Sequence, residues 1–319
     1  MSKKILIADK LGKPGLEILD KMSDMSYDLR TGMSKEELLA AIPDYEAVIV
    51  RSDTYIDADV LAAGTQLKVV GRAGIGVDNI DVTAATARGV MVMNTPHSNS
   101  VATAEQTLTL LLAVSRKTVA AHNSLAAGEW ERNLYVGTEL FGKTLGIIGF
   151  GYIGRLVAHR AQAFGVNVIA YDPYVTAETG MELNVAMLPM ADVLAQSDLL
   201  TLHAIVTPET KGMINAATIA GMKDGVIIVN VARGKLIDEQ ALADALKSGK
   251  VAAAGLDVYQ EEPPTHSPLI GLPNVIHTPH LGASTVEAQR NVGIEMVEQI
   301  ADALRGVSYR NVLNPVKPG

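Results

Sequence analysis

The sequence predicts an α/β protein with two doubly wound domains, each built on a mostly parallel sheet. Its 319 residues exceed one ordinary domain and suffice for two, each with its own core. With 48% hydrophobic and 19% charged residues, the chain has the composition of a compact globular protein. Short apolar runs alternate with helix-like segments, and this alternation restarts in the middle of the chain. Such a rhythm is typical of βαβ units.

The first domain is expected to contain strands at residues 4–8, 47–50, 67–70 and 90–93. A long apolar-periodic stretch at 100–127 then predicts one connecting helix, with Leu108, Leu111, Leu112 and Ser115 on one face. Further buried strands are expected at 144–148, 168–171, 199–202, 226–229, 252–256 and 275–276. A helix over 285–304 opens with Ser284 and Glu287 in capping-box spacing. If it returns to the first domain, that domain comprises residues 1–98 and 286–319, and the second comprises 99–285.

Composition and charge exclude several classes of function. A net charge of −8 without a basic stretch argues against a nucleic acid partner. The longest apolar run, near 108–114, is far shorter than the roughly 20 residues that span a bilayer, so no membrane segment is expected. The first strand begins too early for a signal peptide, which favours the cytoplasm. Without cysteine or an HExxH pair, no disulfide, thiolate nucleophile or metal site is expected.

A glycine-rich turn at residues 149–154 is the first candidate binding site. Gly149, Gly151 and Gly154 fit G-x-G-x-x-G, a weak pattern by itself, but they follow a predicted strand and precede a predicted helix. In that context the glycines allow a tight turn, a close approach to a pyrophosphate and close helix packing, and the helix N-terminus supplies amide donors. We therefore expect a Rossmann dinucleotide-binding domain.

Asp172 lies 23 positions after Gly149, at the end of the next predicted strand. It could accept hydrogen bonds from an adenosine ribose, or it could be an ordinary turn aspartate before Pro173. No Arg or Lys between 172 and 183 would neutralise a 2′-phosphate. The sequence therefore favours NAD over NADP.

Three polar side chains follow three different predicted strands of the second domain: Arg233, Glu262 and His280. Ligands bind at the carboxyl ends of strands in such sheets, so the three side chains could converge there. Arg233 could bind a carboxylate through two parallel hydrogen bonds, His280 could exchange a hydroxyl proton, and Glu262 could orient the imidazole and favour its charged form. Taken singly, they could equally be a solvated loop arginine, a surface carboxylate and a helix cap.

The sequence resembles the D-isomer-specific 2-hydroxyacid dehydrogenase family over nearly its full length. The resemblance depends on 149–154 with Asp172, and on 230–234, 257–263 and 279–285, in that order. It implies a flavodoxin-like substrate-binding domain beside the Rossmann NAD-binding domain, and Arg233, Glu262 and His280 as the catalytic set. The cofactor-binding residues that it implies are Gly149, Gly151, Tyr152, Ile153, Gly154, Asp172, His203, Val231, Ala232, Asp257 and Gly282.

Within the family the likeness is greatest to members that oxidise 3-phospho-D-glycerate in serine biosynthesis, in segments 71–79, 93–96 and 130–132. It implies a homodimer with the helix after Asn99 at its interface, and Arg132 reaching a partner's site. The implied substrate-binding residues are Arg51, Ser52, Arg72, Gly74, Asn99 and Arg132. Two or three arginines suit a phosphate, which carries nearly two negative charges.

Two features depart from these members, and two alternative functions remain open. Ile205 stands where the family usually has proline, which leaves the shape of that cofactor-side loop undefined. The chain ends at Gly319 without the regulatory extension that some members carry, so feedback through such a domain is not expected. The alternatives are a hydroxypyruvate, glyoxylate or other 2-oxo acid reductase, and an NADH-responsive corepressor-like binding protein.

Overall fold

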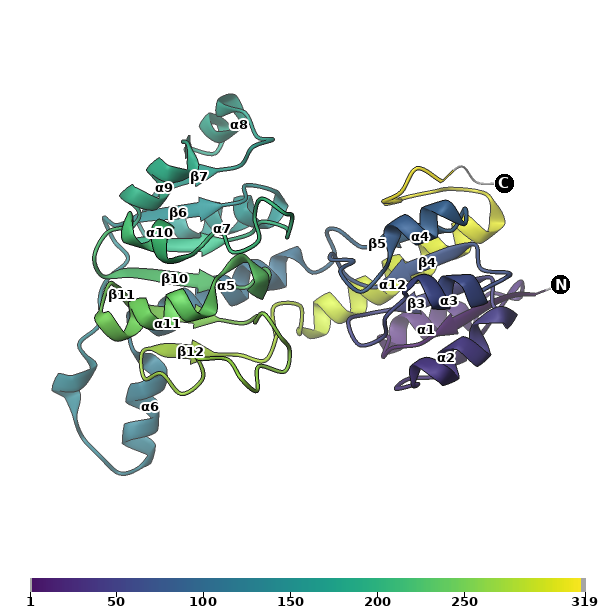
Figure 1. Cartoon of the computed structure of the whole chain (residues 1–319), viewed down its shortest axis with the longest axis horizontal. Helices are drawn as coiled ribbons and strands as arrows, with labels where there is room; N and C mark the ends of the chain where they lie inside the picture. Colours follow the sequence, from purple (N-terminus) through teal and green to yellow (C-terminus); the bar gives the residue numbers. More distant parts are fainter. Residues whose placement is uncertain (1, 317–319) are drawn as a thin grey trace. The chain divides into compact units, whose positions relative to one another are not determined.

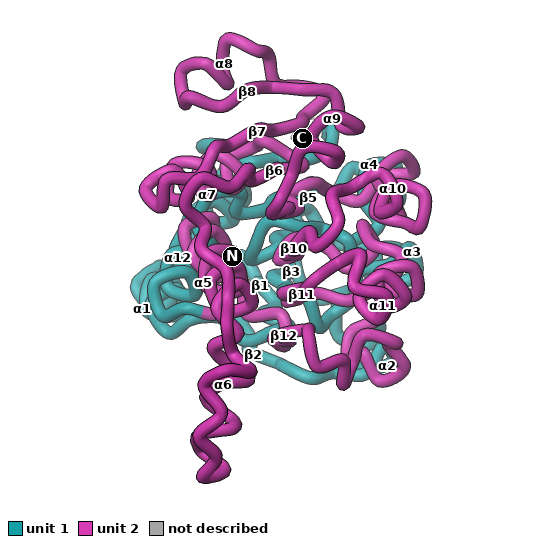
Figure 2. The backbone as a smooth tube through the Cα atoms, turned by 90° about the vertical axis from the view of Figure 1, so that its left-hand side faces the viewer, with its two compact units in different colours: residues 1–99, 285–319 teal, residues 100–284 magenta. Residues whose placement is uncertain are grey.

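The computed structural model describes residues 2–316 and divides into two compact units. Unit 1 comprises residues 1–99 and 285–319, and unit 2 comprises 100–284 (Figure 2). The chain therefore passes from one unit to the other twice, after Asn99 and after Ser284.

Unit 1 contains a five-stranded parallel sheet in the order β2-β1-β3-β4-β5 (Figure 1). This is the flavodoxin-like order that the sequence predicted. The strands are β1 (Lys3–Ile7), β2 (Met25–Leu29), β3 (Ala47–Val50), β4 (Val69–Arg72) and β5 (Met91–Asn94).

Helices cover both faces of this sheet, because successive strand residues point to opposite sides. Ile5 and Ile7 pack with the apolar side of α12, whereas Leu6 packs in a second cluster with α2 and α3. The helices of unit 1 are α1 (Lys13–Leu19), α2 (Lys35–Ala41), α3 (Ala58–Ala63), α4 (Val82–Ala87) and α12 (Val286–Arg305), with a 3₁₀ turn η1 (Ile42–Asp44).

Unit 2 contains a seven-stranded parallel sheet in the order β12-β11-β10-β9-β6-β7-β8. Counted within the unit this is 7-6-5-4-1-2-3, the Rossmann order with a seventh strand at one edge. The Rossmann domain was predicted, whereas only six of its strands were expected. The strands are β6 (Thr144–Ile148), β7 (Asn167–Tyr171), β8 (Ala186–Met187), β9 (Leu199–Leu202), β10 (Val226–Asn230), β11 (Val251–Leu256) and β12 (Val275–His277).

The two faces of this sheet have separate cores. Leu111 of α5 and Val157 of α7 pack on one face, and Leu194 of α9 and Leu242 of α11 pack on the other. The helices of unit 2 are α5 (Ser100–Ser115), α6 (Thr118–Ala126), α7 (Tyr152–Gln162), α8 (Ala177–Glu182), α9 (Met190–Gln196), α10 (Ala216–Ala220) and α11 (Glu239–Ser248), with 3₁₀ turns η2 (Arg132–Tyr135) and η3 (Gly234–Leu236). No helix in the part of the chain that the structure describes has the length and apolar character to cross a membrane.

The single helix expected at 100–127 is wrong, because the structure has two helices there. Lys117 lies in the left-handed region with φ of 52°, which ends α5. The Ser115 carbonyl accepts the amide of Thr138 at 2.8 Å, so the returning chain takes up an oxygen that a continuous helix would use. The segment after α5 thus forms an arm, residues 116–141, that extends away from the sheet of unit 2 (Figure 1).

The other differences concern short or terminal features. Strand β2 was not expected because only Met25 of its five residues is buried, as suits an edge strand. Strand β8 has only two residues. The N-cap of α12 is Thr285, whose hydroxyl accepts the Ala288 amide, so the expected cap at Ser284 is wrong by one residue.

Candidate active site

The candidate residues of unit 2 lie along one edge of its sheet, at the carboxyl ends of the strands. The strand order reverses between β6 and β9, which is where open α/β sheets bind their ligands. Along this edge the residues that follow β7, β6, β9, β10, β11 and β12 are, in spatial order, Asp172, Gly149, His203, Arg233, Asp257 and His280.

The glycine turn between β6 and α7 has the geometry that dinucleotide binding needs. Gly149 has φ of 92°, and a Cβ there would lie 2.6 Å from the backbone of His203. A Cβ on Gly154 would lie 2.3 Å from the Gly149 carbonyl oxygen, whereas a Cβ on Gly151 would meet nothing within 4 Å. Gly151 is the N-cap of the 11-residue α7 and has no capping side chain. The turn thus leaves open space beside the first amides of the helix, including those of Tyr152 and Ile153, and fits the pyrophosphate of NAD.

Asp172 connects the end of β7 to this turn. Its carboxylate accepts the amide of Phe150 at 2.8 Å and the amide of Tyr174 at 2.9 Å. Asp172 is thus a turn aspartate that lies beside the glycines, and its role in binding the ribose stays a prediction. A carboxylate has about four acceptor positions, so two bonds leave capacity for ribose hydroxyls.

His203 follows β9, next to the glycine turn. Its Nε2 lies 2.5 Å from Thr201 Oγ1, and burial lowers its pKa from 6.5 to about 3, so the ring is neutral. In the loop that follows, the Ile205 side chain is 72% exposed and the Ile205 carbonyl accepts the Thr210 hydroxyl at 2.7 Å. This hydrogen bond is one of several that hold the loop, since the Thr210 hydroxyl also accepts the Thr207 amide at 2.7 Å.

The turn after β10 presents Arg233 and is shaped by Asn230, a residue whose role the sequence did not indicate. The fully buried Asn230 side chain accepts the Ala232 amide at 3.0 Å and donates to the Arg233 carbonyl at 2.9 Å. A Cβ on Gly234 would lie 1.9 Å from the Tyr259 backbone, so this turn packs directly against the segment that carries Glu262. Within the turn Val231 is buried and Ala232 is partly buried.

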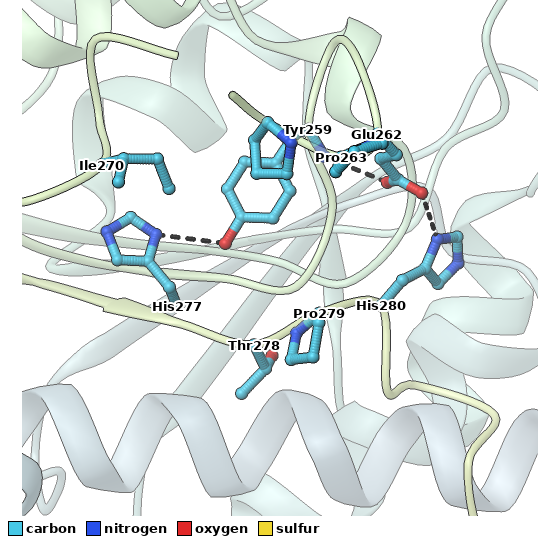
Figure 3. Close-up of a pocket in the computed structure, with 9 residues that line it drawn as sticks. Tyr259, Glu262, Pro263, Ile270, His277, Thr278, Pro279 and His280 are labelled. Atoms are coloured by element: carbon cyan, nitrogen blue, oxygen red, sulfur yellow. Dashed lines mark hydrogen bonds and ion pairs between the residues drawn. The ribbon is translucent and has the colours of Figure 1, made fainter. Parts of the chain in front are cut away.

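Glu262 and His280 form a hydrogen bond, with 2.7 Å between Oε2 and Nδ1 (Figure 3). The other carboxylate oxygen of Glu262 accepts the Tyr259 amide at 3.2 Å. Burial raises the pKa of Glu262, but the His280 hydrogen bond, the Tyr259 amide and the charge of Arg233 lower it more, so the net pKa is below its ordinary value. Arg233 is thus close enough to act electrostatically on this pair. The structure brings the three predicted catalytic residues together.

Asp257 holds the loop that carries His280. Its fully buried carboxylate accepts the Thr278 hydroxyl at 2.5 Å and the amides of Leu281 and Gly282 at 2.7 and 2.8 Å. Its carbonyl accepts the His280 amide at 2.9 Å. The expected role of Asp257 and Gly282 in cofactor binding stays a prediction, and the contacts seen are those of a loop anchor.

A cavity of about 380 Å³ adjoins the pair of Glu262 and His280. Figure 3 shows Tyr259 and His277 on one side of it and His280 on the other. Its remaining lining is Thr278 and four apolar residues, Pro263, Pro264, Ile270 and Pro279. Among residues 2–316 no cluster of three or more His, Asp or Glu is arranged to hold a metal ion.

In unit 1, Arg51 and Arg72 lie at the same edge of the five-stranded sheet. Val50 and Arg72 are register partners on β3 and β4, and Arg51 is the next residue. The 51–54 loop is held by Asp9, which accepts the Arg51 amide at 2.5 Å and the Thr54 hydroxyl at 2.6 Å. Asn79 donates to the carbonyls of Arg51 and Thr54 at 2.7 and 2.6 Å.

The other residues with an expected substrate role lie in different surroundings. Ser52 is exposed in the 51–54 loop and Asn99 is buried at the end of unit 1. Gly74 has φ of 149°, and a Cβ there would lie 1.6 Å from Nη1 of Arg72, so the guanidinium occupies the space of a side chain at 74. Arg132 is exposed on η2, within the arm of unit 2.

Comparison with known proteins assigns the chain to one family. The profile described as "D-isomer specific 2-hydroxyacid dehydrogenase, NAD binding domain" matches residues 108–282. D-3-phosphoglycerate dehydrogenases are similar: that of Mycobacterium leprae is 50% identical over 310 residues, and that of Archaeoglobus fulgidus is 47% identical over 312. These alignments cover 97% and 98% of this chain but only 58% and 59% of the relatives, so the chain spans about three fifths of their length. A glyoxylate reductase from Paecilomyes thermophila has a similar structure, with a TM-score of 0.90, 32% identity and 99% of both chains covered.

The chain belongs to the D-isomer specific 2-hydroxyacid dehydrogenase family. Unit 2 is the NAD-binding domain of that family, and the glycine turn lies within the matched residues.

Proposed function

We propose that this protein is an NAD-dependent dehydrogenase that oxidises the C2 hydroxyl of a D-2-hydroxy acid, with 3-phospho-D-glycerate as its substrate. The observation that carries the proposal is the pair of Glu262 and His280 beside Arg233, at the sheet edge that also bears the glycine turn. The names of the two relatives support the choice of substrate.

The hydrogen bond to Glu262 determines which ring nitrogen of His280 takes part in proton transfer. Because Oε2 accepts a hydrogen bond from Nδ1–H, the neutral ring carries its lone pair on Nε2. Nε2 therefore takes the hydroxyl proton during oxidation and returns it during reduction. The imidazolium that forms is stabilised by the ionised Glu262.

Arg233 binds the substrate carboxylate and the C2 oxygen. Its planar guanidinium can form two parallel hydrogen bonds to a carboxylate. The 149–154 turn and Asp172 would hold NAD, which would supply the acceptor for the hydride that leaves C2. Pro263, Pro264 and Pro279 form an apolar wall beside the pair of Glu262 and His280.

We also propose that Arg51 and Arg72, with Ser52, Gly74 and Asn99, bind the substrate in unit 1, and that Arg132 contributes from a second copy of the chain. The register of β3 and β4 places Arg51 and Arg72 at one edge, where two guanidinium groups suit a phosphate. The anchoring of the 51–54 loop by Asp9 and Asn79 supports a preformed site.

Steady-state kinetics with NAD test the substrate. We expect kcat/KM for 3-phospho-D-glycerate to exceed that for unphosphorylated D-glycerate. Arg51→Ala should raise KM for the phosphorylated acid far more than for glycerate, and Arg88→Ala, an exposed arginine at the end of α4, should change neither. Equal use of both acids would instead favour the 2-oxo acid reductase, the activity named for the fungal glyoxylate reductase.

A further inference from the structure

We propose that Thr278 and Gln106 are positioning residues for His280, through which helix α5 fixes the loop that carries the acid–base group. This inference rests on the proposed role of His280. The two side chains are 172 residues apart in the sequence. Their hydrogen bonds lead to Asp257, and not directly to the imidazole of His280.

The two side chains form a short hydrogen-bonded series that ends on Asp257. Nε2 of Gln106 lies 3.2 Å from Oγ1 of Thr278, and this oxygen lies 2.5 Å from Oδ1 of Asp257. The same Oδ1 accepts the Leu281 amide, and Oδ2 accepts the Gly282 amide. Asp257 thus connects α5 to the residues that directly follow His280.

The direction of each hydrogen bond follows from the chemistry of the groups. An ionised carboxylate only accepts, so the single hydroxyl proton of Thr278 goes to Asp257. The threonine oxygen can then act only as an acceptor. Gln106 therefore donates to it through its amide nitrogen. A glutamate at 106 would have the same shape but no proton to donate.

The loop needs such support because of its backbone conformation. His280 has φ of 55°, in the left-handed region that a residue with a Cβ adopts at a cost. Its amide is held between the carbonyls of Asp257 at 2.9 Å and Thr278 at 3.1 Å. Movement of Asp257 or Thr278 therefore moves the backbone of His280, and with it the ring that meets Glu262.

Helix α5 holds the loop at a second point, one turn earlier. Oγ1 of Thr103 lies 3.3 Å from the carbonyl oxygen of Gly282, and residues three apart lie on the same side of a helix. Thr103 and Gln106 thus contact the loop after and before His280. The imidazole is positioned by a rigid helix rather than by its own loop alone.

Kinetics and cofactor titration of the full-length protein test the proposal. Thr278→Val keeps the shape of the side chain and removes the hydroxyl. It should lower kcat on the order of 10- to 100-fold, since a displacement of about 1 Å can cost about 100-fold. The dissociation constant for NADH, measured by its fluorescence, should change little, and the acidic limb of the pH profile should shift. Thr278→Ser, which restores the hydroxyl, should recover most of the lost turnover.

Two more variants keep the test decisive. Gln106→Glu should also lower kcat, because it removes the donor and places a second carboxylate near Asp257. Thr107→Val, a buried change on the same helix whose hydroxyl donates only to the Thr103 carbonyl at 2.9 Å, should behave as wild type. If Thr278→Val does not fold, as judged by circular dichroism, Gln106→Glu decides alone.

Unchanged kcat in the folded variants, or an equal loss in Thr278→Ser and Thr278→Val, would overturn the positioning role. If His280→Ala kept its activity, the proposed function itself would fail instead.

Discussion

At the scale of single residues, the site depends on groups whose neighbours determine their protonation. Glu262 is ionised because its hydrogen bond to His280, the Tyr259 amide and the charge of Arg233 outweigh the effect of burial on its pKa. His203 is neutral because burial lowers its pKa to about 3. His203 and His280 therefore differ in their surroundings. His280 has the Glu262 carboxylate beside it, whereas His203 is buried next to Thr201.

His280→Ala and Arg233→Ala should each reduce turnover severely. General acid–base catalysis contributes about 100-fold to 10,000-fold, so His280→Ala should lower kcat by a factor in that range. The affinity for NADH should stay close to that of wild type, because the glycine turn and Asp172 lie on other strands. Stopped-flow turnover and fluorescence titration measure the two quantities. A His280→Ala protein that remained active at neutral pH would contradict the assignment.

Glu262→Gln should change the acid stability of the protein in a defined pH range. The folded-state pKa of Glu262 lies below its ordinary 4.5, so its stabilising contribution is complete above that value and is lost as the pH falls through the lowered pKa. The difference in Tm between wild type and Glu262→Gln should be present at pH 5 and shrink below about pH 4.5. Thermal unfolding at intervals of half a pH unit checks this. A difference that grew in acid would have the wrong sign.

At the scale of elements, two glycines at the N-terminus of α7 allow cofactor binding and stability to be tested separately. Gly151→Ala adds a methyl group to open space, so the fold should stay intact while the affinity for NADH falls. Gly154→Ala adds a methyl group 2.3 Å from the Gly149 carbonyl oxygen, and overpacking of this kind typically costs about 1–3 kcal/mol. Calorimetry and NADH titration of both variants should show a lower Tm for Gly154→Ala alone and weaker binding for both. An unchanged affinity of Gly151→Ala would argue against a pyrophosphate at this turn.

The elements that the sequence predicted well are those that are buried on both faces. Strands β3, β6 and β9 match the expected ranges, because central parallel strands are continuous apolar runs. Strand β2 was not predicted, because an edge strand with one buried residue lacks that pattern. The break between α5 and α6 was not predicted, because it involves a hydrogen bond from Thr138 to Ser115. Thr138 lies outside the apolar-periodic stretch that predicted the helix.

At the scale of the whole molecule, the arm of unit 2 exposes an apolar surface without a partner in the chain that the structure describes. Trp130, Leu134, Val136 and Phe141 are 75%, 60%, 71% and 77% exposed. Several large exposed apolar side chains on one segment are typical of an interface, and a second copy of this chain is the occupant that we propose.

The double variant Trp130→Ser and Leu134→Ser should therefore shift a dimeric protein to monomers. Light scattering coupled to size exclusion measures the mass. Met181→Ser, a change at a side chain of α8 that is 71% exposed, is the control and should leave the mass unchanged. If Arg132 acts across the interface, the monomer should also lose activity on 3-phospho-D-glycerate. A monomeric wild-type protein would refute the proposed role of the arm.

The sequence alone determined the fold class, the glycine turn and the catalytic residues Arg233, Glu262 and His280 as candidates. Local rules suffice for these features: apolar runs indicate buried strands, and polar residues just after them lie at the carboxyl edge of a parallel sheet. Only the tertiary structure decided that Oε2 of Glu262 contacts Nδ1 of His280, that Asn230 shapes the turn of Arg233, and that Gln106 of α5 reaches Thr278. These contacts join residues of different strands and helices, and their geometry depends on the packing of the folded chain, which no local pattern in the sequence encodes.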